Sequence, residues 1–260
     1  MRNEALVGYL LHQRPYQEKR ALYYLFSEQH GVIHGIGKKG APLFMPLQLF
    51  ATGKRDLKTF SQIGIAAQHS TQLDPKKDDD VTVDSLPYEN ITGQHQYSAL
   101  YLNEILWRLL PTEDPMPLLW QHYQNSLQQL RQPLSADELR LCLRQFEQHL
   151  FSELGFTLAL THDSVQDSIE PDTTYRFLPD VGLVPILSNN TQSEHLESAT
   201  GQSVLMGSDI IAMAQLGITE TTLNHWSKLH RHLIDHLLDY QPLQSRLYGS
   251  SSNVINKDFL

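Results

Sequence analysis

Cysteine is almost absent from the sequence, because Cys142 is the only one among 260 residues. A single thiol excludes an intramolecular disulfide, and it excludes a metal cluster that needs several cysteine ligands. Cys142 lies in the stretch Leu139–Leu154, whose apolar residues have helical spacing. We expect a small, partly buried helix residue; a catalytic nucleophile is the alternative.

Long apolar runs are also missing. No run reaches the roughly 18 residues that a membrane-spanning helix needs. The apolar N-terminal stretch Ala5–Leu11 is short, contains Gly8 and is not followed by a small-residue cleavage site, so it lacks the pattern of a secretory signal. The sequence therefore predicts a cytoplasmic protein with no membrane segment.

Motifs of the common enzyme classes are absent or incomplete. There is no G-x-S-x-G elbow and no phosphate-binding P-loop. Gly35–Gly40 matches G-x-G-x-x-G, but Pro42 and Pro46 follow where a dinucleotide site needs a helix. His232 and His236 lie one helical turn apart without an identifiable third metal ligand. We therefore expect no catalytic residues, no bound metal and no cofactor.

The net charge of −9 argues at first against a nucleic-acid partner, because phosphate contacts need lysine and arginine. The charge is unevenly distributed, however. Residues 1–60 contain nine basic and four acidic residues, a net charge of +5, whereas the other 200 residues have a net charge of −14. Such asymmetry is typical of proteins whose basic part binds nucleic acid.

Short β-type segments fill the first 65 residues of the chain. Each is rich in apolar residues and is bounded by turn residues, the first turn being expected at Gln13–Pro15. Five strands in a segment of this length indicate an OB-fold, a small barrel that often binds single-stranded nucleic acid. The predicted strands are Ala5–His12, Lys19–Phe26, Val32–Ile36, Leu43–Phe50 and Leu57–Ile65.

The remainder of the chain predicts a mainly α-helical domain. Apolar residues recur with helical spacing from Gln96 onward, and Ser135 and Glu138 have the spacing of a capping box before a helix. The fold class is therefore α+β. We assign residues 1–70 to the OB-fold, 71–95 to a linker or exposed loop, 96–248 to the helical domain with a short β-hairpin within 161–190, and 249–260 to a flexible tail.

Basic residues gather around the predicted turns of the barrel. Such cations are suited to follow a phosphate backbone, and an exposed Tyr16 ring is suited to stack on a base. The alternative for Tyr16 is packing against its own barrel. The candidate nucleic-acid-binding residues are Arg14, Tyr16, Lys19, Arg20, Lys38, Lys39, Lys54, Arg55 and Lys58.

Five segments carry a resemblance to a known family, in the same order and over nearly the whole chain. They are Tyr9–Tyr16, Gly53–Thr59, Tyr101–Leu110, Leu143-Arg-Gln-Phe-Glu147 running on to Phe156, and Pro242–Arg246. Together they resemble the RecO family of DNA repair proteins. The resemblance implies an N-terminal OB-fold and a helical domain.

The resemblance also implies a function. RecO proteins are non-enzymatic recombination mediators that bind single- and double-stranded DNA and anneal complementary strands, which implies action at the nucleoid. They bind the acidic tail of single-strand binding protein and, with RecR, help to load RecA. Arg144 matches the arginine of the family motif that receives this tail, and Arg140 lies one turn earlier. Many relatives carry a four-cysteine zinc module, but residues 161–190 have no cysteine, so we expect only the hairpin there.

Two other functions remain open on the sequence. One is a protein-interaction adaptor with an OB-like domain and little DNA affinity. It is suggested by the acidic remainder of the chain and by the loop after Lys39, which is shorter and less basic than in relatives. The other is a metal-dependent hydrolase that uses His232 and His236.

Overall fold

The computed structural model describes residues 2–66, 90–186 and 203–251, with side chains up to residue 247. The chain divides into two compact units. The barrel unit comprises residues 1–93 and 110–120, and the helical unit comprises residues 94–109 and 121–260. No helix in these described ranges is both long enough and apolar enough to cross a membrane.

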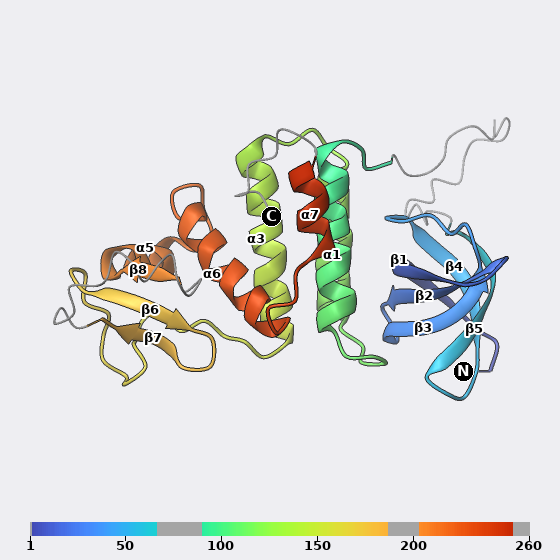
Figure 1. The fold of residues 1–260 in the computed structure, drawn as a ribbon, viewed down its shortest axis with the longest axis horizontal. Coiled ribbons are helices and arrows are strands. Elements are labelled where there is room, and N and C mark those ends of the chain that lie inside the picture. The colour runs from blue at the N-terminus through green and yellow to red at the C-terminus, as the bar shows by residue number, and fades with distance from the viewer. Residues whose placement is uncertain (1, 67–89, 187–202, 252–260) are drawn as a thin grey trace, which may run out of the picture. The chain divides into compact units, whose positions relative to one another are not determined.

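The barrel unit contains a closed five-stranded barrel with the strand order β1-β2-β3-β5-β4. β3 and β5 are parallel, the other neighbouring pairs are antiparallel, and β1 closes the barrel against β4. Figure 1 shows these strands in blue to cyan. The predicted barrel is confirmed, with strands β1 (Glu4–Gln17), β2 (Arg20–Ser27), β3 (Gly31–Lys38), β4 (Pro46–Thr52) and β5 (Leu57–Ile65).

Alternate residues of the strands point into the barrel and fill it. Gly35 and Gly37 also face inward: a Cβ at Gly35 would lie 2.5 Å from the Phe60 ring, and a Cβ at Gly37 would lie 2.7 Å from Ile63 Cδ1. The G-x-G-x-x-G pattern therefore makes room for core side chains. The core consists of Leu6, Leu10, Ala21, Tyr23, Leu25, Ile33, Leu47, Leu49, Ala51 and Phe60.

Strand β1 is longer than predicted. It continues through Pro15, where we expected a turn, and the turn to β2 is formed by Glu18 and Lys19. Proline is tolerated because β1 beyond Tyr9 pairs only with β2 and needs no N–H donor on its other side. Irregular pairing after Leu10 and after Pro15 accommodates the additional residues.

Residues 110–120 belong to the barrel unit, although the helix before them does not. The Glu113 N–H donates a hydrogen bond to the Val32 carbonyl, with an N···O distance of 2.9 Å. Gly31 has a φ of +62°, and a Cβ there would lie only 1.9 Å from the carbonyl oxygen of Asp114. The close approach of this segment to β3 therefore depends on a glycine.

The helical unit is built on packed helices, and the predicted mainly helical part is confirmed. α1 packs against α3 and α7, and α3 packs against α6 (Figure 1). The predicted capping box is present, because Ser135 and Glu138 each bind the other's backbone N–H. The helices are α1 (Gln94–Leu109), α2 (Pro117–Leu130), α3 (Ala136–Glu153), α5 (Gly207–Leu216), α6 (Leu223–Leu237) and α7 (Gln244–Ser251).

A small sheet in the helical unit has the strand order β7-β6-β8. β6 (Thr174–Leu178) and β7 (Gly182–Pro185) form the predicted hairpin. Sequence patterns missed β8 (Val204–Met206), which is too short to show a periodicity. They also missed α7: we expected a flexible tail from residue 249, but the helix runs to Ser251.

Several predicted segments lie outside the described residues. These include residues 71–89 of the predicted linker, with its charged run at 74–80, and residues 252–260 of the predicted tail. The domain boundaries inferred from the sequence stay predictions.

Replacing Gly31 by alanine should destabilise the barrel unit. The new Cβ would collide with a backbone oxygen, and the left-handed φ would strain it, for a total cost of about 2–4 kcal/mol. Urea unfolding followed by circular dichroism measures this cost. Gly64→Ala is the matched control, because nothing lies within 4 Å of its Cβ position. Equal midpoints for the two variants would contradict the close approach.

Candidate functional site

Four of the predicted cations come together at one end of the barrel. Arg20 and Lys38 lie directly opposite each other in the β2–β3 register. The Lys39 N–H donates to the Lys19 carbonyl at 3.2 Å, and the Lys39 ammonium donates to the Glu18 carbonyl at 2.9 Å. Lys19, Arg20, Lys38 and Lys39, here called the turn cations, therefore form one basic surface.

Arg14 and Tyr16 extend from β1 toward the same end. Tyr16 is 53% exposed, so its ring is not packed into the barrel. Arg14 is exposed, and its guanidinium lies over the ring of Tyr24, with Cζ 5.7 Å from the ring centroid. Both side chains thus reach the surface beside the turn cations.

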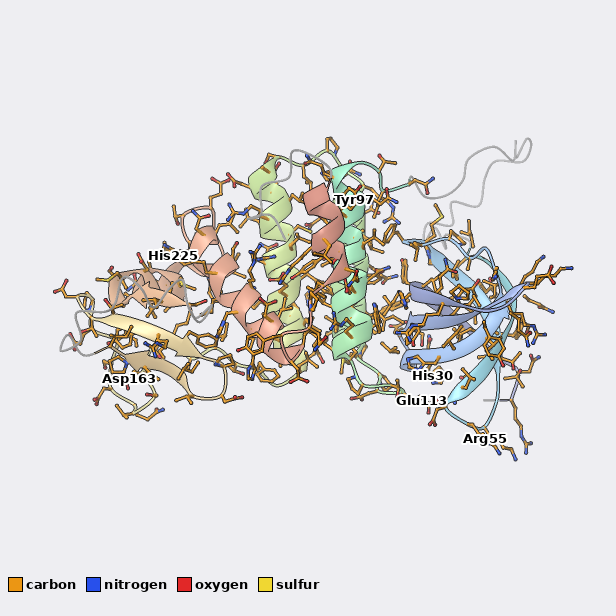
Figure 2. The ribbon with its side chains drawn as sticks, in the orientation of Figure 1. His30, Arg55, Tyr97, Glu113, Asp163 and His225 are labelled. Carbon is orange, nitrogen blue, oxygen red and sulfur yellow. The ribbon has the colours of Figure 1, made fainter. Side chains whose placement is uncertain are left out.

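Lys54 and Arg55 lie toward the other end of the barrel. β5 runs parallel to β3 and begins opposite His34, so the turn that precedes β5 points away from Lys38. Figure 2 shows the labelled Arg55 near Glu113, the residue that follows the bridge to β3. The predicted cations therefore form two separate groups and not a single surface.

The position of Lys58 does not fit its prediction as a nucleic-acid-binding residue. We expected an exposed cation, but the residue is 5% exposed and forms an ion pair with Glu113. Its ammonium also donates to the Arg55 carbonyl at 2.6 Å. A lysine that is buried and already neutralised does not present its charge to a phosphate.

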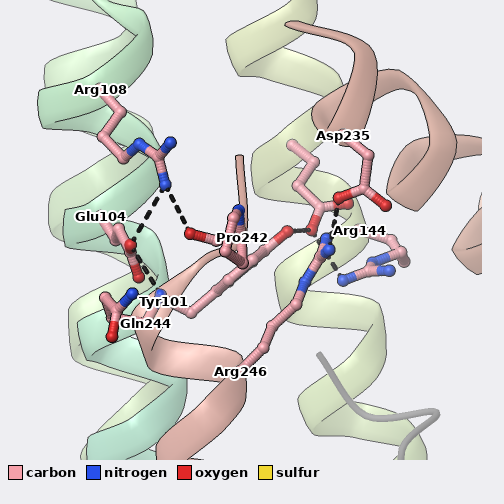
Figure 3. A network of polar contacts seen from close by, with 9 residues as sticks. Tyr101, Glu104, Arg108, Arg144, Asp235, Pro242, Gln244 and Arg246 are labelled. Atoms are coloured by element: carbon pink, nitrogen blue, oxygen red, sulfur yellow. Dashed lines mark hydrogen bonds and ion pairs between the residues drawn. The ribbon is translucent and has the colours of Figure 1, made fainter. Parts of the chain in front are cut away.

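Arg144 is also placed differently from the expectation. As a receptor for an acidic tail it should reach the surface, but it is 3% exposed. Its guanidinium donates to Glu147 Oε1, with an Nη2···O distance of 2.7 Å. Figure 3 shows Arg144 among the polar side chains between the helices. An external carboxylate does not reach it in this structure.

Glu147 is the centre of this buried polar cluster, and it is fully buried on α3. Besides Arg144, it accepts a short hydrogen bond from the Tyr101 hydroxyl of α1. Its second oxygen lies 2.9 Å from His230 Nδ1 of α6. One carboxylate thus connects three helices.

Burial alone would raise the pKa of the Glu147 carboxyl, but the Arg144 charge and the hydrogen bonds from His230 and Tyr101 outweigh it and lower the pKa. Burial lowers the pKa of His230, despite the neighbouring Glu147. Burial and the same carboxylate raise the pKa of Tyr101. At neutral pH we therefore assign an ionised Glu147, a neutral His230 that donates from Nδ1, and a neutral Tyr101.

A second buried acid holds helix α7. The Glu104 carboxylate accepts hydrogen bonds from the backbone N–H groups of Gln244 (2.9 Å) and Ser245 (2.8 Å), which are orphan donors at the start of α7. Arg246, in the same helix, donates to Asp235 of α6 at 2.5 Å. Figure 3 shows the contacts of Glu104 with Gln244 and of Arg246 with Asp235, which link α1 and α6 to α7.

Sequence analysis missed Glu147 and Glu104 as organising residues. A signal was present, because each acidic residue falls within a helical run whose buried residues are mostly apolar. Buried carboxylates need partners, so such positions predict cations or N–H donors nearby. The identity of those partners depends on the tertiary fold.

Arg140 lies nearer the surface than Arg144. Its side chain is 15% exposed and donates to Asn224 at 2.6 Å and to Ser227 at 3.4 Å. An ion pair of 3.4 Å also joins it to the exposed Asp137. Of the two predicted tail-binding residues, only Arg140 keeps an appreciable part of its side chain at the surface.

Comparison with known proteins identifies the family. A sequence model described as "Recombination protein O C terminal" matches residues 92–247. The chain belongs to the RecO family. A protein named DNA repair protein RecO from Pseudomonas paraeruginosa is 36% identical over 188 residues, which cover 70% of this chain and 71% of that protein.

Two longer matches carry the same name. The protein from Coxiella burnetii is 29% identical over 251 residues, covering 92% of this chain and 94% of the relative. The one from Marinobacter nauticus is 30% identical over 259 residues, covering 95% and 94%. The resemblance to the RecO family is confirmed over most of the chain, and it ties the chain to DNA repair and recombination.

The histidines and the cysteine that were considered for metal binding or catalysis are not placed for either role in the described residues. His232 packs against Phe177, and His236 lies 3.2 Å from Asp180. Among the described residues, no group of three or more His, Cys, Asp or Glu side chains is placed to hold a metal ion. Burial raises the pKa of Cys142 to about 11, which does not suit a nucleophile.

Stability of the helical unit should fall when the pH drops below about 6.5, the ordinary value for histidine. The pKa of His230 is lower in the folded chain than in the unfolded chain. As the pH falls, the unfolded chain therefore binds the proton first, and this protonation stabilises the unfolded state. Glu147, with a lowered folded pKa, adds a further loss at more acidic pH. His230→Asn keeps a donor and cannot titrate, so thermal unfolding between pH 5 and 7 should depend less on pH. An identical pH dependence in both proteins would contradict the neutral assignment.

Proposed function

We propose that this RecO-family chain is a recombination mediator in DNA repair that catalyses no reaction and needs no cofactor. It binds single- and double-stranded DNA through the barrel unit and anneals complementary strands. Its helical unit binds the acidic tail of single-strand binding protein. Together with RecR, the protein promotes the loading of RecA.

The turn cations are the observation that carries the DNA-binding part of this proposal. Four basic side chains meet on a barrel of the type that binds single strands, within the segment whose net charge is +5. Each contact between such a cation and a phosphate releases condensed counterions, which makes binding strongly dependent on salt. Arg14 and Tyr16 extend the same surface.

A protein-interaction adaptor with little DNA affinity is the second candidate. Two observations favour it. The residues after position 60 have a net charge of −14, and one of the predicted cations, Lys58, is neutralised by Glu113. In that case the barrel would contact a protein partner.

The tail-binding part of the proposal rests on Arg140. The tail of single-strand binding protein is acidic, so its receptor needs a cation that reaches solvent. Arg140 meets this requirement in part, and its contacts with Asn224 and Ser227 hold the guanidinium between α3 and α6. Arg144 contributes to the fold of the same helix region through its ion pair with Glu147.

Charge reversal at the turn cations should weaken DNA binding more than the same reversal at the other end of the barrel. Lys19→Glu/Lys39→Glu should raise the Kd for a labelled single strand at least tenfold and reduce the slope of log K against log salt by about 1.4. Fluorescence anisotropy at several salt concentrations measures both quantities.

The matched control is Lys54→Glu/Arg55→Glu, which changes the net charge by the same amount and should alter the Kd less than threefold. Equal effects of the two variants would show that net charge alone governs binding. If the unaltered protein binds no DNA at low salt, the adaptor is favoured.

Arg140→Glu should weaken binding of an acidic peptide with an apolar C-terminal residue. We expect about a tenfold rise in Kd, as for loss of a charge-assisted hydrogen bond of about 1.5 kcal/mol. Isothermal titration calorimetry with the full chain tests this, with Arg131→Glu as a charge-matched control. Unchanged affinity in a folded Arg140→Glu variant would remove Arg140 from the tail site.

A further inference from the structure

The outer face of β1, β2 and β3 carries aromatic side chains in cross-strand rows. Residues opposite one another in the register share a face of the sheet. In the first row, Tyr9 of β1 is opposite Phe26, and Phe26 is opposite Val32. In the next outward row, His12 is opposite Tyr24, and Tyr24 is opposite His34.

The first row already receives an aromatic ring from the chain itself. Trp120, at the end of the segment 110–120, packs against Tyr9 with ring centroids 5.1 Å apart and against Phe26 with centroids 5.4 Å apart. Tyr9, Phe26 and Trp120 are all buried as a result. The outer face of these strands therefore packs against an aromatic ring that does not belong to the barrel strands.

The second row, His12, Tyr24 and His34, is here called the ring row. The centroid of Tyr24 lies 5.4 Å from that of His12 and 4.4 Å from that of His34. All three residues are partly exposed, in contrast with the buried first row. Burial lowers the pKa of His34, although Asp56 opposes the shift, so an uncharged ring prevails there at neutral pH.

Cations flank the ring row on the same face. Arg14 lies over Tyr24 at 5.7 Å. Arg20 is opposite Lys38 in the β2–β3 register, four residues along each strand from Tyr24 and His34 and on the same face. Planar rings with cations alongside are the two components that a site for single-stranded nucleic acid combines, because the rings stack on bases and the cations follow the phosphates.

We propose that the ring row is a base-stacking platform that makes the barrel prefer single-stranded over double-stranded DNA. This inference rests on the proposed DNA binding and adds the source of strand selectivity. The two imidazoles are inclined to the Tyr24 ring by 57° and 62° and so form its sides. An unpaired base stacks on the face of Tyr24 and displaces the Arg14 guanidinium toward the adjacent phosphate. The bases of a duplex are already stacked on each other, so duplex DNA contacts only the cations.

The test compares the affinity of the full chain for a labelled thymidine oligonucleotide with its affinity for a duplex of equal length. Tyr24→Leu keeps apolar volume and removes the aromatic face. We expect single-strand binding to weaken about tenfold, with duplex binding within twofold and the salt slope unchanged. Tyr24→Phe keeps the ring and should retain single-strand affinity. Unfolding midpoints of both variants establish that the barrel is intact.

The outcomes separate this inference from the proposal on which it rests. If Tyr24→Leu binds the single strand as the unaltered protein does, while Lys19→Glu/Lys39→Glu weakens binding, the platform is wrong and DNA binding on the barrel stands. Equal losses for single strand and duplex in Tyr24→Leu also overturn the platform. If the unaltered protein binds neither DNA, the proposed function itself fails.

Discussion

The ionised, fully buried Glu147 is the constraint on which the helical unit depends. A carboxylate without water must be matched by donors, and here Arg144, Tyr101 and His230 supply them from α3, α1 and α6. Removing one partner of such a cluster costs about 3–5 kcal/mol, because a buried charge is left uncompensated. The residue that sequence resemblance assigns to a partner, Arg144, is therefore needed for the fold.

The barrel unit, too, contains both a cation that the fold neutralises internally and cations that stay at the surface. Lys58 is neutralised by Glu113, whereas the turn cations are held by backbone geometry with their side chains at the surface. Charge counted along the sequence overestimates the basic surface that is open to a partner, because it includes cations that the fold uses internally. The structure removes Lys58 from the predicted set and divides the other cations between the two ends of the barrel.

The barrel and most helices were predictable because short-range patterns encode them. Short apolar runs bounded by turn residues indicated the five strands, and Ser135 with Glu138 indicated the start of α3. Helix α7 was not predictable, because its first turn is capped by Glu104, 140 residues earlier in the chain than Gln244. The site was predictable as a group of basic residues, but its division into two groups follows from the parallel pairing of β3 and β5, which no local pattern reveals.

Hydrogen–deuterium exchange of the full chain, with and without a saturating thymidine oligonucleotide, tests whether DNA occupies the turn cations and the adjoining outer face of β1, β2 and β3. If it does, we expect slower exchange in peptides that cover residues 12–24 and 34–40, with little change over residues 53–58. Protection confined to residues 53–58 or to the helical unit would contradict it.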